Sequence, residues 1–141
     1  MDAVGEILVE RGAGDAAGYH DDAYAAAGAT LTDNAFDADV VVKVRKPSQE
    51  EIARLRDGAV YISLIETCED DGTLKSLFDR NIKAIAMERV PRISRAQSMD
   101  ALSSQANLAG YVAVIEAARN LPRIFPMMMT PAGALKPAKV F

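Results

Sequence analysis

The chain has 141 residues, 50% of them hydrophobic, and a net charge of −4 at neutral pH. This length allows one domain with a buried core, and the mildly acidic charge gives no electrostatic reason to expect nucleic acid or an anionic membrane as partner. No segment has the apolar length of a membrane span, and no secretory pattern is present. Cys68 is the only cysteine, which excludes an intrachain disulfide and favours a reducing compartment. The only histidine, His20, lies far from Cys68 in the sequence, which argues against a metal cluster.

Short apolar runs alternate with helical patterns in the first part of the chain. Residues 6–9 predict a buried strand that leaves into a tight turn at residues 11–14. A short helix is predicted over residues 21–27, where Gly28 ends it, and a brief strand follows at residues 30–31.

The β-branched run at residues 39–44 predicts a buried strand, although Lys43 interrupts it. A lysine in this position either lies at the end of the strand facing a site or extends its ammonium group to the surface. A helix opened by Ser48 is predicted over residues 49–55, and another strand is predicted over residues 59–64.

After an acidic loop, Thr73 is predicted to cap a helix that ends near Arg80, and residues 82–87 predict one more strand. Three apolar side chains are expected on the core-facing side of this helix, namely Leu74, Leu77 and Phe78. Strands that alternate with helices through short connections favour an α/β fold: an open parallel sheet with helices on both faces and right-handed crossovers.

A polar loop at residues 91–100 leads into a long helix predicted over residues 101–119. Pro91 suits the exit from a strand, and Asp100 can accept hydrogen bonds from the first turn of the helix. The helix has a bulky apolar face, a face of mostly small apolar residues, and a small polar stripe formed by Ser103, Asn107 and Gly110. We therefore expect it to be buried between layers, with the stripe open to another backbone or a ligand.

The loop itself concentrates hydrogen-bonding side chains, at Arg92, Ser94, Arg95, Gln97, Ser98 and Asp100. Guanidinium, amide, hydroxyl and carboxylate groups this close together can recognise an anion and an amide at once. The alternative is a solvated polar loop, which residue types alone leave open. Beyond the helix, the apolar residues 124–129 suit irregular packing between domains, and residues 139–141 predict the start of a strand.

The stretch PRISRAQSMDALSSQANLAGYVAVIEAA resembles the signature of the NAD-binding part, domain I, of the alpha subunit of proton-translocating NAD(P) transhydrogenases, a family that includes alanine dehydrogenases. The segments EILVERGAG, DADVVVKVRKPS and PAGALKPAKV extend the similarity. The resemblance implies the flavodoxin- or Rossmann-like N-terminal domain of the family over residues 1–120, and a crossover into a Rossmann NAD-binding domain over residues 121–141. It also implies a strand–helix unit ahead of Gly5 and a nucleotide-binding domain after Phe141, so we expect a fold truncated at both ends.

The resemblance further implies an enzyme component that transfers hydride between NADH and NADP+, coupled to proton translocation by separate membrane domains. NAD(H) would be the cofactor of this component and NADP(H) that of a partner domain, and the isolated chain would be inactive. The implied partners are the NADP-binding domain, the membrane subunit and a second copy in a homodimer. The implied location is cytoplasmic, peripheral to the membrane through these partners.

Specific roles follow from the same resemblance. Arg92 would reach the pyrophosphate or the nicotinamide carboxamide, and Gln97 would bridge toward the ribose of the second nucleotide. Asp100 and Ser103 would hold the carboxamide, and Gln97 and Asp100 would be the catalytic pair, with no metal. The chemistry agrees, because hydride transfer asks the protein for positioning and electrostatics, and none of these four side chains titrates near neutral pH unperturbed.

Two alternatives remain. Alanine dehydrogenase chemistry needs a lysine and a histidine for the keto acid and its proton; Lys43 falls at the family's lysine, but Ser63 stands at the histidine's place. This difference favours transhydrogenase and leaves Lys43 and Ser63 as possible substrate-end residues. The other alternative is a non-catalytic α/β interaction module.

Overall fold

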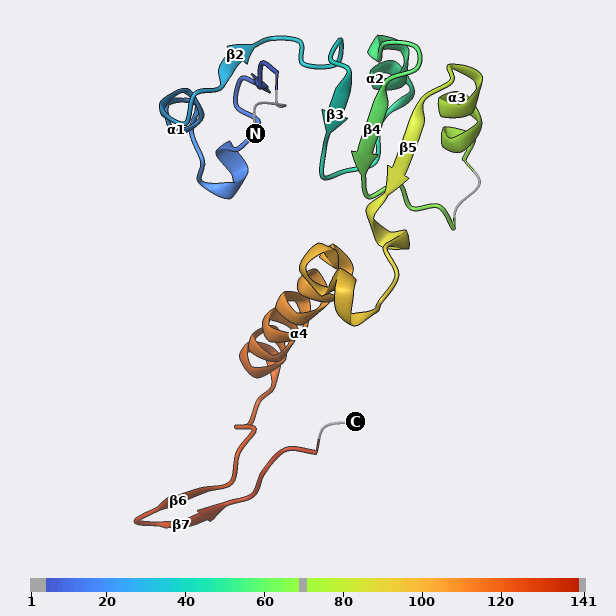
Figure 1. The fold of residues 1–141 in the computed structure, drawn as a ribbon. Coiled ribbons are helices and arrows are strands. Elements are labelled where there is room, and N and C mark those ends of the chain that lie inside the picture. Colours follow the sequence, from blue (N-terminus) through green and yellow to red (C-terminus); the bar gives the residue numbers. More distant parts are fainter. Residues whose placement is uncertain (1–4, 69–70, 140–141) are drawn as a thin grey trace. The chain divides into compact units, whose positions relative to one another are not determined.

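The computed structural model describes residues 5–68 and 71–139. They divide into two compact units, Met1–Val90 and Pro91–Phe141, and Figure 1 shows the elements of each. The first unit contains strands β1 (Leu8–Glu10), β2 (Thr30–Thr32), β3 (Val40–Val42), β4 (Val60–Ser63) and β5 (Lys83–Ala86), and helices α1 (Asp21–Ala26), α2 (Gln49–Arg54) and α3 (Thr73–Asp79). Each predicted strand and helix of this unit is therefore present, with small shifts at the ends.

The strands of the first unit form two parallel sheets. One has the order β1-β2 and the other the order β3-β4-β5, and every pairing in them is parallel, as in Val41 opposite Tyr61 and Tyr61 opposite Ala84. Parallel strands need crossover connections, which α2 and α3 supply between β3, β4 and β5. The predicted fold class, α/β with parallel strands, is confirmed.

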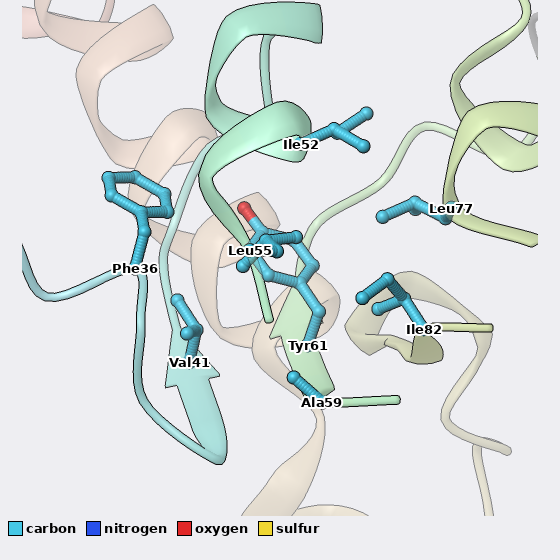
Figure 2. Close-up of a cluster of buried hydrophobic side chains, with 8 residues drawn as sticks. All are labelled: Phe36, Val41, Ile52, Leu55, Ala59, Tyr61, Leu77 and Ile82. Atoms are coloured by element: carbon cyan, nitrogen blue, oxygen red, sulfur yellow. The ribbon is translucent and has the colours of Figure 1, made fainter. Parts of the chain in front are cut away.

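The core of the first unit lies between β3-β4-β5 and the two helices α2 and α3. Tyr61 rises from β4 in the middle of this cluster, with Phe36 and Val41 on one side and Leu77 and Ile82 on the other (Figure 2). The cluster is completed by Ile52, Leu55 and Ala59. Burial of these side chains is the main stabilising contribution to the unit.

Three predictions about burial are wrong in detail. The strand predicted as buried at residues 6–9 corresponds to β1, whose residues are only partly buried. In β3 only Val41 is buried, and its neighbours Val40 and Val42 are 53% and 74% exposed. In α3 only Leu77 of the three expected apolar residues reaches the core, since Leu74 and Phe78 are exposed. A periodic apolar pattern identifies the side chains able to be buried, but the neighbouring elements determine which of them are covered.

The start of α2 is closed by a reciprocal pair of hydrogen bonds. The Ser48 hydroxyl accepts from the Glu51 backbone N–H at 3.2 Å, and the Glu51 carboxylate accepts from the Ser48 N–H at 2.8 Å. This capping box satisfies two backbone donors that the first turn would leave open. By contrast, Gly72 rather than Thr73 is the residue that caps α3, and Thr73 is its first helical residue.

Replacing Ser48 with alanine is expected to lower the free energy of unfolding by about 1 kcal/mol, because the Glu51 N–H loses its partner. Urea denaturation followed by circular dichroism would measure this. The matched change Glu50→Gln, on the same turn but outside the box, should cost less than about 0.5 kcal/mol. Equal losses in the two variants would contradict the role assigned to the capping box.

The second unit begins with a 3-10 helix, Ser94–Met99, followed by α4 (Ala101–Asn120) and a hairpin of β6 (Met128–Thr130) and β7 (Gly133–Leu135). The hairpin was not predicted. It closes at Gly133, whose φ of +123° suits glycine, and the Thr130 hydroxyl donates to the Gly133 carbonyl at 2.8 Å. The strand expected at residues 139–141 lies largely outside the described residues.

Helix α4 has the predicted extent, but the expectation that it is buried between layers is wrong for the part of the chain that the structure describes. No residue of α4 is buried, and Leu108, Val112 and Ile115 are all exposed. A Cβ added at Gly110, in the small polar stripe, would meet no atom within 4 Å. The helix thus presents its apolar faces without a covering layer.

Candidate functional site

A cavity of about 500 Å³ lies where the polar loop joins α4. Its lining consists of Arg92, Ile93, Ser94, Gln97, Asp100, Ser103 and Ser104. The four residues that the resemblance singled out, Arg92, Gln97, Asp100 and Ser103, therefore share one cavity. The lining contains a cation, an anion, an amide and hydroxyl groups, and its one large apolar side chain is that of Ile93.

The 3-10 helix explains how the loop places these groups together. Side chains three positions apart lie above one another in a 3-10 helix, so Ser94 and Gln97 share one side, and Asp100 and Ser103 continue the three-residue spacing. Ala96 is the buried residue of the 3-10 helix. Short-range hydrogen bonds within the loop also order it, among them the bond from the Ala96 N–H to the Ile93 C=O at 2.9 Å.

Asp100 connects the loop to the helix, as predicted. Its Oδ1 accepts from the Ser103 N–H at 2.8 Å, which satisfies one open donor of the first turn of α4. The Ser104 hydroxyl donates to the Asp100 carbonyl at 2.9 Å. The side chain and the carbonyl of Asp100 are thus both held by the first turn of α4.

The same contacts set the charge of the site. Hydrogen bonding from the Ser103 hydroxyl and then from the Ser103 N–H lowers the pKa of Asp100 below its usual value, and the positive charge of Arg92 adds to the effect. Asp100 is consequently a carboxylate at neutral pH, able to accept hydrogen bonds and unable to donate a proton.

Replacing Ser103 with alanine is expected to raise the pKa of Asp100 toward its usual value, because the largest cause of the lowered pKa is removed. Since the folded pKa is lowered, the Asp100 cap stabilises α4 above the unfolded pKa of about 3.9 and is lost as pH falls through the folded value. NMR titration of the Asp100 carboxyl carbon would measure the shift. Ser104→Ala, which touches only the Asp100 carbonyl, should leave the pKa in place; an equal shift in both variants would contradict the assignment.

The two possible substrate-end residues, Lys43 and Ser63, belong to the first unit and are not among the residues lining this cavity. Lys43 directly follows β3, and its ammonium group forms an ion pair with the Glu51 carboxylate. Burial alone would raise the pKa of Glu51, but the hydrogen bond from Lys43 and the Ser48 contacts lower it. Ser63 is 1% exposed, and its hydroxyl donates to the Leu64 carbonyl at 3.3 Å.

Two lining residues, Ile93 and Ser104, were absent from the predicted site, and Ser94 was named in the polar loop without a role of its own. The three-residue spacing of positions 94, 97, 100 and 103 was the available signal for Ser94, although such a spacing in a polar segment does not by itself predict a 3-10 helix.

Within residues 5–68 and 71–139, no group of three or more His, Cys, Asp or Glu side chains could hold a metal ion. In that same part of the chain, no helix combines the length and apolar character needed to cross a membrane.

The fold and the cavity together define a parallel α/β protein with a polar, ligand-sized cavity at the amino end of a long helix. Residues 1–109 match the family model described as "Alanine dehydrogenase/PNT, N-terminal domain". The chain belongs to this family.

Individual relatives refine this relationship. An NAD(P) transhydrogenase alpha subunit chain of Rhodospirillum rubrum is 49% identical over 96% of this chain and 38% of its own length. The alanine dehydrogenase of Bacillus subtilis is 32% identical over 76% of this chain and 28% of its own length. The crystal structure of transhydrogenase from Sinorhizobium meliloti superimposes with a TM-score of 0.86 at 46% identity, covering 94% of this chain and 41% of that one. These matches confirm the resemblance to transhydrogenase alpha subunits, and the chain spans well under half the length of each of these relatives.

Proposed function

We propose that this chain is part of the NAD(H)-binding component of a proton-translocating NAD(P) transhydrogenase. In this proposal hydride passes between NADH and NADP+, and separate membrane domains carry the proton. The observation that carries it is the shared cavity of Arg92, Gln97, Asp100 and Ser103 in a chain 49% identical to a transhydrogenase alpha subunit.

The residues of the cavity fit the nicotinamide end of a dinucleotide. A carboxamide offers an NH2 donor and a carbonyl acceptor, which match the ionised Asp100 carboxylate and the donors of Ser103 and Arg92. A guanidinium group is also suited to a pyrophosphate. The volume of about 500 Å³ lies in the usual range for small-molecule sites.

Bound NADH would supply the hydride, and the chain's own residues would supply position and charge. Asp100 and Ser103 would fix the rotation of the carboxamide, and therefore the ring face that is presented to the acceptor. Arg92 would hold the cofactor by charge, and Gln97 would reach toward the second nucleotide. Asp100, ionised and held by the first turn of α4, would not exchange protons with the substrate.

Several observations favour this reaction over alanine dehydrogenase chemistry. Ser63, at the place of the dehydrogenase histidine, is buried and bonded to a backbone carbonyl, and a serine hydroxyl does not titrate near neutral pH. The ammonium group of Lys43 is paired with the Glu51 carboxylate. Identity to the Rhodospirillum rubrum transhydrogenase subunit is 49%, against 32% to the Bacillus subtilis alanine dehydrogenase.

The proposal includes partners. The NADP(H) would be bound by a separate domain, and a membrane subunit would carry the proton, so this component would be cytoplasmic and held at the membrane through them. A homodimer of the NAD(H)-binding component completes the proposed assembly. The partial coverage of the relatives makes the activity one of the whole assembly rather than of these 141 residues alone.

The test is a chimeric alpha subunit in which this chain replaces the matching segment of the Rhodospirillum rubrum relative. Gln97→Asn shortens the side chain by one methylene and keeps its amide, so hydride transfer between bound NADH and NADP+ should slow by about tenfold or more if reach matters. The rate would be measured in a single turnover as the transfer of deuterium from NADH labelled at the nicotinamide C4 to NADP+, followed by rapid quenching and mass spectrometry of the NADPH formed. An unchanged rate would remove Gln97 from the mechanism, and pyruvate-dependent oxidation of NADH by the chimera would favour the alanine dehydrogenase alternative.

A further inference from the structure

Ile93 is the one large apolar side chain that lines the loop cavity of the second unit. The rest of the lining is polar, with the guanidinium of Arg92, the amide of Gln97, the carboxylate of Asp100 and three serine hydroxyl groups. Ile93 is 53% exposed, so apolar surface of this side chain is available at the cavity. Such surface gains free energy when an apolar part of a ligand covers it.

The backbone around Ile93 is held on both sides. Its N–H donates to the Pro91 carbonyl at 2.9 Å, and its carbonyl accepts from the Ala96 N–H at 2.9 Å. Ala96 itself is only 4% exposed, which anchors this turn. Branching at Cβ further restricts the Ile93 side chain to few rotamers. Ile93 therefore lines the cavity from a fixed position, and a ligand gains its contact without first ordering a free loop.

The nicotinamide ring is the part of a dinucleotide whose charge depends on its oxidation state. In NADH the ring is an uncharged dihydropyridine, whereas in NAD+ it is a pyridinium cation. Covering a face of the neutral ring with an aliphatic side chain is favourable. Covering a face of the cation costs part of its hydration. An aliphatic contact on a ring face therefore favours the reduced form over the oxidised form.

The charged groups of the cavity act differently on the two forms. Hydrogen bonding from Ser103, together with the charge of Arg92, holds the pKa of Asp100 below its usual value, so Asp100 is a carboxylate at neutral pH. This negative charge attracts a pyridinium cation and does little for the neutral ring. The charge of Arg92 offsets part of the attraction. Ile93 is thus the one large side chain of the lining that favours the reduced ring.

We infer that Ile93 is the apolar contact for one face of the nicotinamide ring and that it shifts the preference of the site toward NADH over NAD+. This role rests on the proposed function, since the ring must occupy this cavity, and it adds a residue and a property that the proposed function does not specify. The polar residues act on the carboxamide, the phosphates and the second nucleotide, and none of them covers a ring face. Ile93 is therefore a specificity-determining residue, which discriminates between two oxidation states of one ligand.

The test compares Ile93→Val with Ile93→Thr in the chimeric alpha subunit. Valine and threonine are both branched at Cβ and similar in shape, but threonine carries a hydroxyl group where valine has a methyl group. Relative to Ile93→Val, Ile93→Thr should weaken NADH binding by about three- to tenfold, because apolar contact with the ring is lost. It should change NAD+ binding by less than about twofold, because the cation gains little from that contact. Fluorescence titration for NADH and calorimetry for NAD+ would give the dissociation constants.

Two further variants serve as controls. Ile93→Val removes one methylene group, so it should weaken NADH binding by no more than about fourfold relative to the unaltered chimera. Met99→Ala lies in the same 3-10 helix, and Met99 is 55% exposed but is not among the residues lining the cavity. Its truncation should leave both dissociation constants within about twofold of their values in the unaltered chimera. A general distortion of the loop would weaken NADH and NAD+ together, whereas loss of the apolar contact weakens NADH alone.

Three results would overturn this role of Ile93 while leaving the proposed function in place. They are equal NADH affinities of the valine and threonine variants, a parallel loss of NADH and NAD+ affinity in Ile93→Thr, and the same change in the ratio of the two affinities in Met99→Ala. An unaltered chimera that binds neither nucleotide would overturn the proposed function itself, and the role of Ile93 with it.

Discussion

Replacing Arg92 with alanine is expected to slow hydride transfer by about 10²–10³-fold in the chimeric alpha subunit, the loss typical when one preorganised electrostatic contact is removed from an active site. Arg92 supplies the positive charge among the residues lining the loop cavity, and it also contributes to the lowered pKa of Asp100. Its removal would leave the cofactor without its cationic contact and Asp100 with a weaker preference for the ionised form. Transfer of deuterium from C4-labelled NADH to NADP+ in a single turnover would follow the rate.

The matched control is Arg95→Ala. Arg95 lies in the same 3-10 helix and carries the same charge, but it is not among the residues lining the cavity. It should transfer hydride at nearly the rate of the unaltered chimera. If both variants lost the same activity, the effect would be one of general charge rather than of the cavity, and the role proposed for Arg92 would fail.

Replacing Leu77 with alanine is expected to lower the free energy of unfolding by about 2–5 kcal/mol, the usual cost of removing a buried leucine side chain. Leu77 is 1% exposed and packs in the cluster around Tyr61. Such a loss is a large fraction of the stability of an ordinary domain, which is about 5–15 kcal/mol. Alanine is a good helix former, so the loss would report packing and not helix propensity.

Leu74→Ala is the control on the same helix. Leu74 is 47% exposed, so its truncation should cost less than about 1 kcal/mol. Urea denaturation of both variants, followed by circular dichroism, would separate them. A cost for Leu74→Ala as large as that for Leu77→Ala would mean that Leu74 is covered in solution, as the apolar pattern of the sequence indicates.

The loop that carries the proposed site could be predicted only in part from the sequence. Its residue types and its cap at Asp100 were evident from the sequence, and the cap is present. The conformation of the loop could not be predicted, because the segment lacks the periodic apolar residues from which helices and strands are inferred. Only the 3-10 geometry brings Ser94 and Gln97 to one side and leaves Arg95 outside the cavity.

The hairpin of the second unit was missed for a different reason. Its strands are three residues each; β6 contains two methionines, and β7 consists of glycine, alanine and leucine. Neither the length nor the composition of these segments signals a strand. Its formation depends on local contacts at the turn, including the Thr130 hydroxyl bond to the Gly133 carbonyl. The run of methionines was interpreted as packing between domains, and Met127, Met128 and Met129 are all exposed in this chain.

The sequence by itself determined the order and type of the elements in the first unit, their parallel α/β class, and the polar residues that flank α4. These follow from features a few residues apart, namely periodicity, caps and turns, which the chain carries wherever it folds. Only the tertiary structure decided that β3 buries Val41 alone, that α4 stays uncovered, and that Arg92, Gln97, Asp100 and Ser103 line one cavity. Burial depends on which elements come to lie beside one another, and the shared cavity depends on the 3-10 conformation of the loop. A local apolar pattern specifies neither.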